Sequence, residues 1–315
     1  MPTLEEAYTE CRAIARREAK NFYFSFVALP AHKRDAMCAV YAFMRRADDL
    51  SDDESLTVEQ RRFDTERWLG EWRSARDGGT TADPVFIALN DTQRRFGISN
   101  DLLEKLVRGT TMDLSEEAPA GVLRTEIDGR SIDAYETFGD LYRYCYLVAS
   151  VVGLVCIRIF GYTDGSAERL AEETGIAFQL TNILRDVKED AERGRVYLPL
   201  EDAALGKGIE LDEILRTAKG ELPSAALKPL LKLEADRAEA YYASASRLLP
   251  LIDADSRAAL WVLVTIYHSL LKLIVKREYD VFAERVSVPT WKKLAILGRG
   301  MAVSMWNRNT GKGTE

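Results

Sequence analysis

The sequence predicts an all-α protein that folds as a single domain. Helix-forming residues dominate its 315 positions, only nine prolines interrupt them, and no block of alternating β-branched residues stands out. Apolar residues recur with the helical period almost throughout, and no internal repeat or low-complexity linker divides the chain. We therefore expect one helical domain over residues 1–315.

The expected helices follow the apolar periodicity in order along the chain. They run over about 4–20, 31–50, 57–77, 83–97, 99–113, 131–160, 166–192, 209–219, 224–249, 254–282 and 289–308. Their breaks coincide with strong turn signals at Pro30, Gly78-Gly79, Gly97, Ala118-Pro119-Ala120-Gly121 and Gly161. Two uncharged runs, 144–157 and 258–271, are shorter than the ~20 residues that span a bilayer. We expect them to be buried helices of a large bundle, not transmembrane segments.

Composition excludes several other classes of protein. Hydrophobic residues make up 47% and charged residues 30% of the chain, which is typical of a folded globular protein. The net charge of −7 argues against nucleic acid as a partner. The four cysteines form no CxxC pair and only two histidines are present, so we expect no zinc site and a reducing cytoplasm. The charged N-terminus is not that of a signal peptide.

An acidic stretch ends the second expected helix, where residues 41–53 read YAFMRRADDLSDD. On a helical wheel, Asp48 and Asp52 continue the apolar stripe that faces the core, with Arg45 beside them. One interpretation is a solvated helix end. However, an unpaired aspartate on a buried stripe is costly, and the helix dipole disfavours negative charge at a C-terminus. A positively charged ligand would offset both costs.

A second ridge of oxygen-bearing side chains follows in residues 175–199, GIAFQLTNILRDVKEDAERGRVYLP. At helical spacing, one border of the buried face carries Gln179, Asn182, Asp186 and Asp190. Mg²⁺ typically takes one or two carboxylates together with phosphate oxygens and water. Nearby cations such as Arg185 suit phosphate oxygens. Two such ridges together predict a metal-bridged diphosphate held between two helices, above an apolar cavity.

At this point the sequence resembles a known family, the squalene and phytoene synthases, which are head-to-head trans-isoprenyl diphosphate synthases. The matching segments are NFYFSFVALP (21–30), YAFMRRADDLSDD (41–53), YCYLVASVVG (144–153) and QLTNILRDVKEDAERGRVYLP (179–199). They occur in the family's order, and the similarity extends from about residue 8 to residue 295. The resemblance implies an isoprenoid-synthase helical bundle around a central apolar cavity. It also implies Mg²⁺-dependent condensation of two identical allylic diphosphates through a cyclopropylcarbinyl diphosphate.

The resemblance also implies roles for individual residues. Asp48 and Asp52 match the first metal-binding motif, and the second motif is matched by Asn182, Asp186 and Asp190. Positions that line the diphosphate site or the cavity are matched by Tyr41, Arg45, Gln179, Arg185, Tyr267 and Arg285. Tyr144 matches a tyrosine that assists proton or cation handling in the first half-reaction, and Asp113 is expected to help the metal site. Ala19 and Asn21 depart from the serine pair that many members carry, which puts one diphosphate contact in doubt.

The substrate is expected to be farnesyl diphosphate. Carbocations react with water, so the pocket for the substrate tails must be dry, and aromatic rings such as Phe22 and Phe26 suit it. In the family a bulky residue at the position of Phe26 is typical of squalene-forming enzymes, because it shortens the cavity. The alternative is a phytoene synthase that uses geranylgeranyl diphosphate, and a remote one is a non-catalytic lipid-binding or assembly protein. No nucleotide fingerprint indicates NADPH, although its use stays possible.

Two related enzyme classes fit the sequence less well. A terpene cyclase would lack the pairing of YCYLVASVVG with RDVKED. A head-to-tail prenyl elongase would show DDxxD in both acidic motifs, whereas the second motif here is NxxxD.

The C-terminal segment suggests contact with a membrane surface. Residues 285–315 carry six lysines or arginines against one glutamate, with Trp291 and Trp306 between them. That composition suits an interfacial helix and peripheral membrane association. A solvated terminal helix packed on the bundle is an equal alternative.

Overall fold

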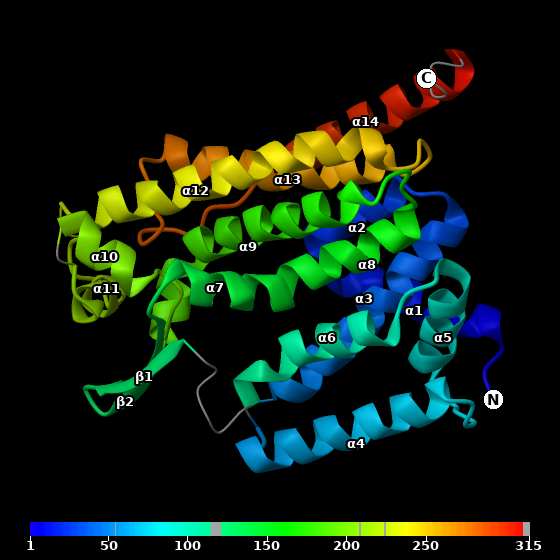
Figure 1. Cartoon of the computed structure of the whole chain (residues 1–315), viewed down its shortest axis with the longest axis horizontal. Coiled ribbons are helices and arrows are strands. Elements are labelled where there is room, and N and C mark those ends of the chain that lie inside the picture. Colours follow the sequence, from blue (N-terminus) through cyan, green and yellow to red (C-terminus); the bar gives the residue numbers. More distant parts are fainter. Residues whose placement is uncertain (54, 115–120, 208, 224, 311–315) are drawn as a thin grey trace.

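Helices form most of the described chain in the computed structural model, which confirms the expected fold class (Figure 1). The structure describes residues 1–53, 55–114, 121–207, 209–223 and 225–310, without the side chains of residues 20, 21, 113, 204–207 and 304–310. Its helices are α1 (Leu4–Glu18), α2 (Lys20–Val27), α3 (Ala31–Ser51), α4 (Val58–Arg76), α5 (Pro84–Phe96), α6 (Asn100–Thr111), α7 (Phe138–Cys145), α8 (Val151–Phe160), α9 (Ser166–Glu192), α10 (Leu200–Lys207), α11 (Leu211–Ala218), α12 (Leu227–Leu248), α13 (Arg257–Lys276) and α14 (Thr290–Thr310).

Local sequence explains where many of these helices begin and end. Thr3 forms a capping box with Glu6 at the start of α1, and Ser99 caps α6 through its side chain. Asp83 caps α5, whose first turn contains Pro84, and Gly97 ends that helix in the left-handed conformation. Side-chain caps satisfy the free N–H groups of a first helical turn, so each end is specified locally.

Helix α9 forms the centre of the bundle. It packs against α12 and α13 on one side and against α7 and α8 on the other (Figure 1). Helices α1, α2 and α3 close one end of the molecule, and α4, α5 and α6 form an outer layer beside α3. The two large hydrophobic clusters of the described residues lie around α3 and α8 and around α9 and α12, and Phe22 packs against both.

A small antiparallel hairpin corrects the expectation of a helix that begins at residue 131. Strands β1 (Val122–Ile127) and β2 (Arg130–Tyr135) pair with each other, and β3 (Arg195–Val196) adds to β2 in parallel. The Asp128-Gly129 turn has positive φ at both positions, at 52° and 71°, as a two-residue hairpin turn requires. Helix α7 therefore starts only at Phe138. Two helices, α2 and α10, are additional to those expected.

A π-helical turn, Tyr146–Ser150, joins α7 to α8 and packs closely against α9. At the contact point α9 carries Gly175, where an added Cβ would lie 2.6 Å from the Cα of Ser150. Turns of this kind often occur at functional sites. Here the turn brings Val148 and Ala149 to the wall of the cavity described below.

The Gly175→Ala substitution is expected to destabilise the protein by about 1–3 kcal/mol, because the methyl group would push against rigid backbone. Gly70, in α4, is the matched control, since a Cβ there meets nothing within 4 Å. Gly70→Ala should stabilise the protein by about 0.5–1 kcal/mol. Urea denaturation of both variants measures the two changes. Equal effects at the two glycines would contradict the close contact.

Two helices are long and apolar enough to cross a membrane by length and composition, Phe138–Phe160 and Arg257–Lys276. Their most apolar windows are 44% and 56% buried within the protein. Residues of both helices line the central cavity, including Cys156 and Leu260. Both segments therefore fit the expected role of buried helices in the bundle.

Candidate active site

A cavity of about 760 Å³ lies between helices α2, α3, α8, α9, α13 and the start of α14. Its polar end contains side chains from α3, α9 and α13 together with the segment before α14. Ten of the residues predicted from the sequence line it: Phe22, Phe26, Tyr41, Arg45, Asp48, Gln179, Asn182, Arg185, Tyr267 and Arg285. Four others are not among its lining residues: Asp52, Tyr144, Asp186 and Asp190.

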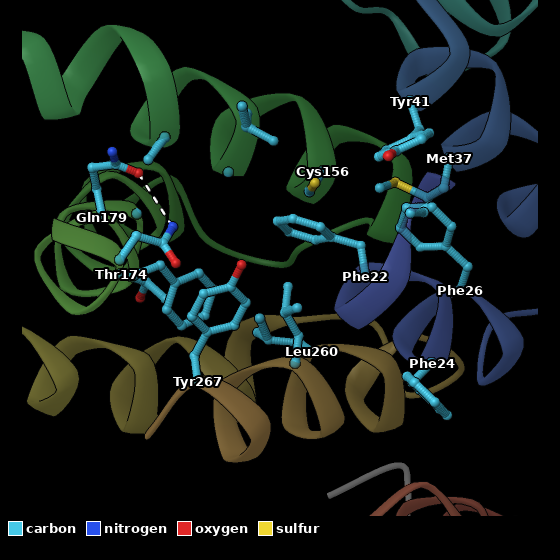
Figure 2. Close-up of a pocket in the computed structure, with 18 of the residues that line it drawn as sticks. Phe22, Phe24, Phe26, Met37, Tyr41, Cys156, Thr174, Gln179, Leu260 and Tyr267 are labelled. Carbon is cyan, nitrogen blue, oxygen red and sulfur yellow. Dashed lines mark hydrogen bonds between the residues drawn. The ribbon is translucent and has the colours of Figure 1, made fainter. Parts of the chain in front are cut away.

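The cavity has a polar end and an apolar end, set by the direction of α3 and α9. On α3 the wall runs from Met37 to Asp48, which spans about 16 Å along the helix axis. On α9 it runs from Ala171 to Arg185, which spans about 21 Å. Figure 2 shows Gln179 and Tyr267 near one end, and Phe26 with Met37 at the other. Each helix therefore carries apolar side chains along one part of its cavity wall and polar ones at the other end of that wall, at Asp48 on α3 and at Asn182 and Arg185 on α9.

Asp48 is the acidic group of α3 that faces the cavity. Burial raises its pKa to about 7, and the neighbouring charge of Asp52 adds to this effect, whereas Arg45 opposes it. Asp52 itself caps the C-terminus of α3, where its N–H donates to the carbonyl of Asp48 at 2.9 Å. It is exposed because the helix ends at Ser51, one residue before Asp52. Two carboxylates one helical turn apart, one half-buried and one exposed, are suited to binding a cation.

Asp186 on α9 forms ion pairs with two arginines. The Nε atom of Arg185 donates to its Oδ1 at 2.7 Å, and the Nε atom of Arg285 donates to the same oxygen at 2.9 Å. Only 17% of the Asp186 side chain is exposed. Because both arginines line the cavity, Asp186 lies directly behind its wall. Of the two acidic motifs, the first therefore reaches the cavity through Asp48, whereas Asp186 of the second lies behind Arg185 and Arg285, and their joint binding of a metal stays a prediction.

Asp190 lies one turn further along α9, beside a much smaller pocket that Arg195 and Tyr197 also line. Burial raises its pKa to about 7, followed by the charge of Asp186, and Arg195 lowers it. Like Asp48, this carboxylate is costly to ionise in the free protein. A bound cation would favour its ionised form.

The oxygen-bearing side chains at this site fit magnesium, and the clearest sign is an unsatisfied oxygen on Asn182. Its Nδ2 donates to Oε1 of Gln179 at 3.4 Å (Figure 2), but its Oδ1 is buried and accepts no hydrogen bond. An orphaned buried oxygen is costly, and a metal ion would satisfy it. Among the described residues, no three acidic, histidine or cysteine side chains gather closely enough to hold a metal by themselves. Mg²⁺ typically completes such a shell with phosphate oxygens and water.

Tyr144 lies away from the cavity wall. Its ring stacks on Tyr197 at 4.7 Å and lies 5.5 Å from Tyr135, between α7 and the small sheet. The structure thus groups three tyrosines beside Asp190 and Arg195, both of which lie in pockets that Tyr197 also lines. The role assigned to Tyr144 by resemblance stays a prediction.

Lys293 is a cavity residue that the sequence argument assigned to the C-terminal basic segment instead. It lies on α14 and lines the polar end together with Thr290, and burial and the nearby Arg185 lower its pKa. The cations at this end are therefore Arg45, Arg185, Arg285 and Lys293. Only the packing of α14 against α13 places this lysine inside, so periodicity alone could not reveal it.

Aromatic rings line the middle of the cavity. Phe178 stacks on Tyr267 with ring centroids 4.6 Å apart, and Phe22 lies 5.9 Å from Tyr267. Figure 2 shows Phe22 projecting between the wall formed by α8 and α9 and that formed by α13. Ala19 also lines the cavity, whereas the side chains of Asn21 and Asp113 lie outside the described residues. Aromatic faces in a dry pocket are suited to stabilising a carbocation.

Comparison with known proteins identifies the same group of enzymes. The family model for squalene/phytoene synthase matches residues 15–292. The 15-cis-phytoene synthase of Synechococcus elongatus is 35% identical over 94% of this chain and 93% of its own length. A phytoene synthase of Mycobacterium tuberculosis is 35% identical over 97% of this chain and 94% of its own length. A dehydrosqualene synthase solved with a ligand is 29% identical, with a TM-score of 0.78 over 95% of this chain and 97% of its own. Squalene synthase HpnC from Alicyclobacillus acidocaldarius is 27% identical, with a TM-score of 0.75 over 88% and 96%.

Proposed function

The chain belongs to the squalene/phytoene synthase family of head-to-head prenyltransferases, and we propose that its substrate is farnesyl diphosphate. Two molecules would condense in a Mg²⁺-dependent reaction to presqualene diphosphate or squalene. The observation that carries this proposal is Phe26, which is 2% exposed and lines the apolar end of the cavity. Its ring packs edge-on against Tyr41 at 6.2 Å and thereby limits the depth available to a tail.

A second candidate is the condensation of two geranylgeranyl diphosphates to phytoene. The names of the sequence relatives favour it, since the proteins at 35% identity are phytoene synthases. The solved relatives at 29% and 27% identity are squalene-type enzymes and favour farnesyl diphosphate. The two candidates differ by one isoprene unit in each tail, so the depth of the cavity decides between them.

The arrangement of charges suits ionisation of an allylic diphosphate. Magnesium, held by Asp48, Asn182 and Asp186, would supply Lewis-acid stabilisation of the leaving diphosphate. Arg45, Arg185, Arg285 and Lys293 would bind its remaining oxygens and orient it at the polar end. Fixed cations stabilise developing negative charge most strongly where water is excluded. The leaving diphosphate would therefore be stabilised in place as the carbon–oxygen bond breaks.

The middle of the cavity suits the carbocation left by that ionisation. The stacked rings of Phe178 and Tyr267 line it, and Phe22 lies beside Tyr267, so aromatic groups that can stabilise a cation surround this part of the cavity. Apolar side chains at the far end exclude water, which would otherwise capture the cation. The second substrate tail would have to share this hollow, which is why its walls are long as well as dry.

Incubation of the purified protein with each diphosphate, with and without Mg²⁺ and NADPH, tests the proposal. Gas chromatography should show a farnesyl-derived product only when Mg²⁺ is present, and the NADPH arm distinguishes presqualene diphosphate from squalene. Condensation of geranylgeranyl diphosphate alone would establish the second candidate instead. Absence of both products would contradict prenyl transfer by this chain.

Phe26→Ala is expected to shift specificity towards geranylgeranyl diphosphate by roughly tenfold or more in relative kcat/KM, because it deepens the apolar end. Phe63→Ala is the control, since this ring on α4 is 62% exposed and does not line the cavity. Competition between the two diphosphates measures the ratio. An unchanged ratio in Phe26→Ala would show that another residue limits the length of the tail.

A further inference from the structure

Over its described side chains, residues 290–303, helix α14 has an outward face without a charged side chain. The exposed positions on that face are Trp291, Leu294, Ala295, Gly298, Met301 and Ala302, which recur at helical spacing. Trp291 is 71% exposed, Leu294 is 54% and Met301 is 40%. The outward face of a surface helix is normally polar. This apolar stripe is therefore unlike the rest of the surface and has no partner among the described residues.

The inward face of the same helix is already occupied. Ile296 is buried against Val262 and Ile266 of α13, and an added Cβ at Gly300 would lie 2.8 Å from Val262. Lys293 and Thr290 line the polar end of the cavity. The apolar stripe thus cannot be explained as the core-facing side of α14. It is a second apolar face, on the side away from the bundle.

Exposed apolar side chains are concentrated here. Thirteen large apolar side chains are exposed among the described residues, and four of them lie between positions 291 and 303. In Figure 1, α14 runs along the edge of the molecule opposite α4 and extends past the bundle at its C-terminal end. A continuous apolar stripe on a projecting helix marks a surface that binds something apolar.

The charges around the apolar stripe indicate which kind of partner it binds. Residues 285–303 contain no acidic residue, although the whole chain carries a net charge of −7. Lys292 and Arg299 flank the apolar stripe on one side. Two copies of the chain meeting through this face would bring like charges together, which disfavours a dimer. An anionic lipid surface, by contrast, offers an apolar interior beneath negatively charged headgroups.

We propose that the outward face of α14 docks the protein on an anionic lipid bilayer at the edge of its cavity. Trp291, Leu294 and Met301 enter the boundary between headgroups and acyl chains, while Lys292 and Arg299 contact the headgroups. The benefit of docking for catalysis rests on the proposed function. Because Lys293 and Thr290 line the cavity from the same helix, docking would place lipid next to the site that takes up and releases apolar tails.

Flotation of the full chain with vesicles tests this proposal. One set of vesicles contains phosphatidylcholine alone and the other contains roughly a third phosphatidylglycerol. The wild-type protein should float with the anionic vesicles, and the triple variant Trp291→Ser, Leu294→Ser and Met301→Ser should bind at least roughly tenfold more weakly. Lys292→Gln with Arg299→Gln should reduce the preference for phosphatidylglycerol and the sensitivity to salt.

The matched control replaces exposed apolar side chains elsewhere, Phe63→Ser and Leu222→Ser, which are 62% and 94% exposed. This variant should bind vesicles as the wild-type protein does. Equal binding of the control and the triple variant, or no binding by the wild-type protein, would overturn the proposal. A concentration-dependent dimer in gel filtration that the triple substitution abolishes, without flotation, would assign the face to self-association instead.

Activity measured without vesicles separates this proposal from that of function. The triple variant should retain wild-type turnover in dilute detergent and lose only its association with vesicles. Flotation without any condensing activity would leave the docking face intact and refute the prenyl transfer. A circular dichroism melt confirms that each variant is folded.

Discussion

Replacing Asp48 with asparagine is expected to reduce kcat/KM by roughly 10²–10³, because one charged ligand at the polar end of the cavity is lost. The side chain keeps its size and lines the same wall, so substrate tails should still fit. The loss should appear mainly as a higher requirement for Mg²⁺. Asp53→Asn is the matched control, since that carboxylate is exposed and accepts hydrogen bonds from Ser55.

The same substitution is expected to stabilise the free protein. Burial raises the pKa of Asp48 from 3.8 to about 7, so the folded state binds this proton more tightly than the unfolded state. The free energy of unfolding therefore falls as pH rises through this window, and Asp48→Asn would remove that fall because an amide does not ionise. At pH 8 we expect a gain of about 1–2 kcal/mol. Near pH 4 the gain should vanish.

Thermal unfolding of Asp48→Asn and the wild-type protein at pH 4 and pH 8, in the absence of Mg²⁺, measures this difference. Saturating Mg²⁺ with a diphosphate analogue should reverse the order of stability, because only the wild-type protein gains a full set of ligands. A variant that loses both activity and stability at pH 8 would show that Asp48 is a structural residue. The predicted opposition of activity and stability is what a ligand site held ready for a cation requires.

The amphipathic pattern correctly predicted which polar side chains face the cavity at positions inside a helix. On α9, the ridge at helical spacing correctly placed Gln179 and Asn182 on the cavity side. On α3, the stripe placed Asp48 correctly, but the helical wheel was extended past the expected helix end at residue 50 to Asp52, which lies at the C-terminal cap. Periodicity identifies a face only as far as the helix extends, and no strong stop signal precedes residue 52.

Other features depend on contacts between segments distant in sequence. Tyr144 is turned towards Tyr197 because a hairpin and β3 pack beside α7, and the all-helical prediction omitted that sheet. The signal for the hairpin was present in Asp128-Gly129, flanked by strand-like alternation. No local signal, by contrast, places Arg285 beside Asp186, which is 99 positions away in the chain.

That long-range contact leads to the second large effect. Arg285→Gln is expected to reduce kcat/KM by roughly 10², because a guanidinium at the cavity wall can bind two phosphate oxygens. In the free protein Arg285 instead forms an ion pair with Asp186. Its Nε atom lies 2.9 Å and its Nη2 atom 2.8 Å from Oδ1 of the carboxylate. If metal and diphosphate bind as proposed, the metal would need the carboxylate of Asp186 and the diphosphate would need the guanidinium of Arg285. The ion pair would then hold both groups until the substrate separates them.

Steady-state kinetics distinguish this account from simple positioning. Arg285→Gln should raise KM for the diphosphate while leaving the Mg²⁺ requirement unchanged or lower, whereas Asp186→Asn should raise the Mg²⁺ requirement. Arg285→Lys should recover only part of the loss, and Arg277→Gln, which removes an exposed pair with Glu284, should cost little. If Arg285→Gln instead raises the Mg²⁺ requirement as Asp186→Asn does, the arginine acts only by orienting the carboxylate. The two substitutions combined should then cost no more than either alone, because each would disable the same metal ligand.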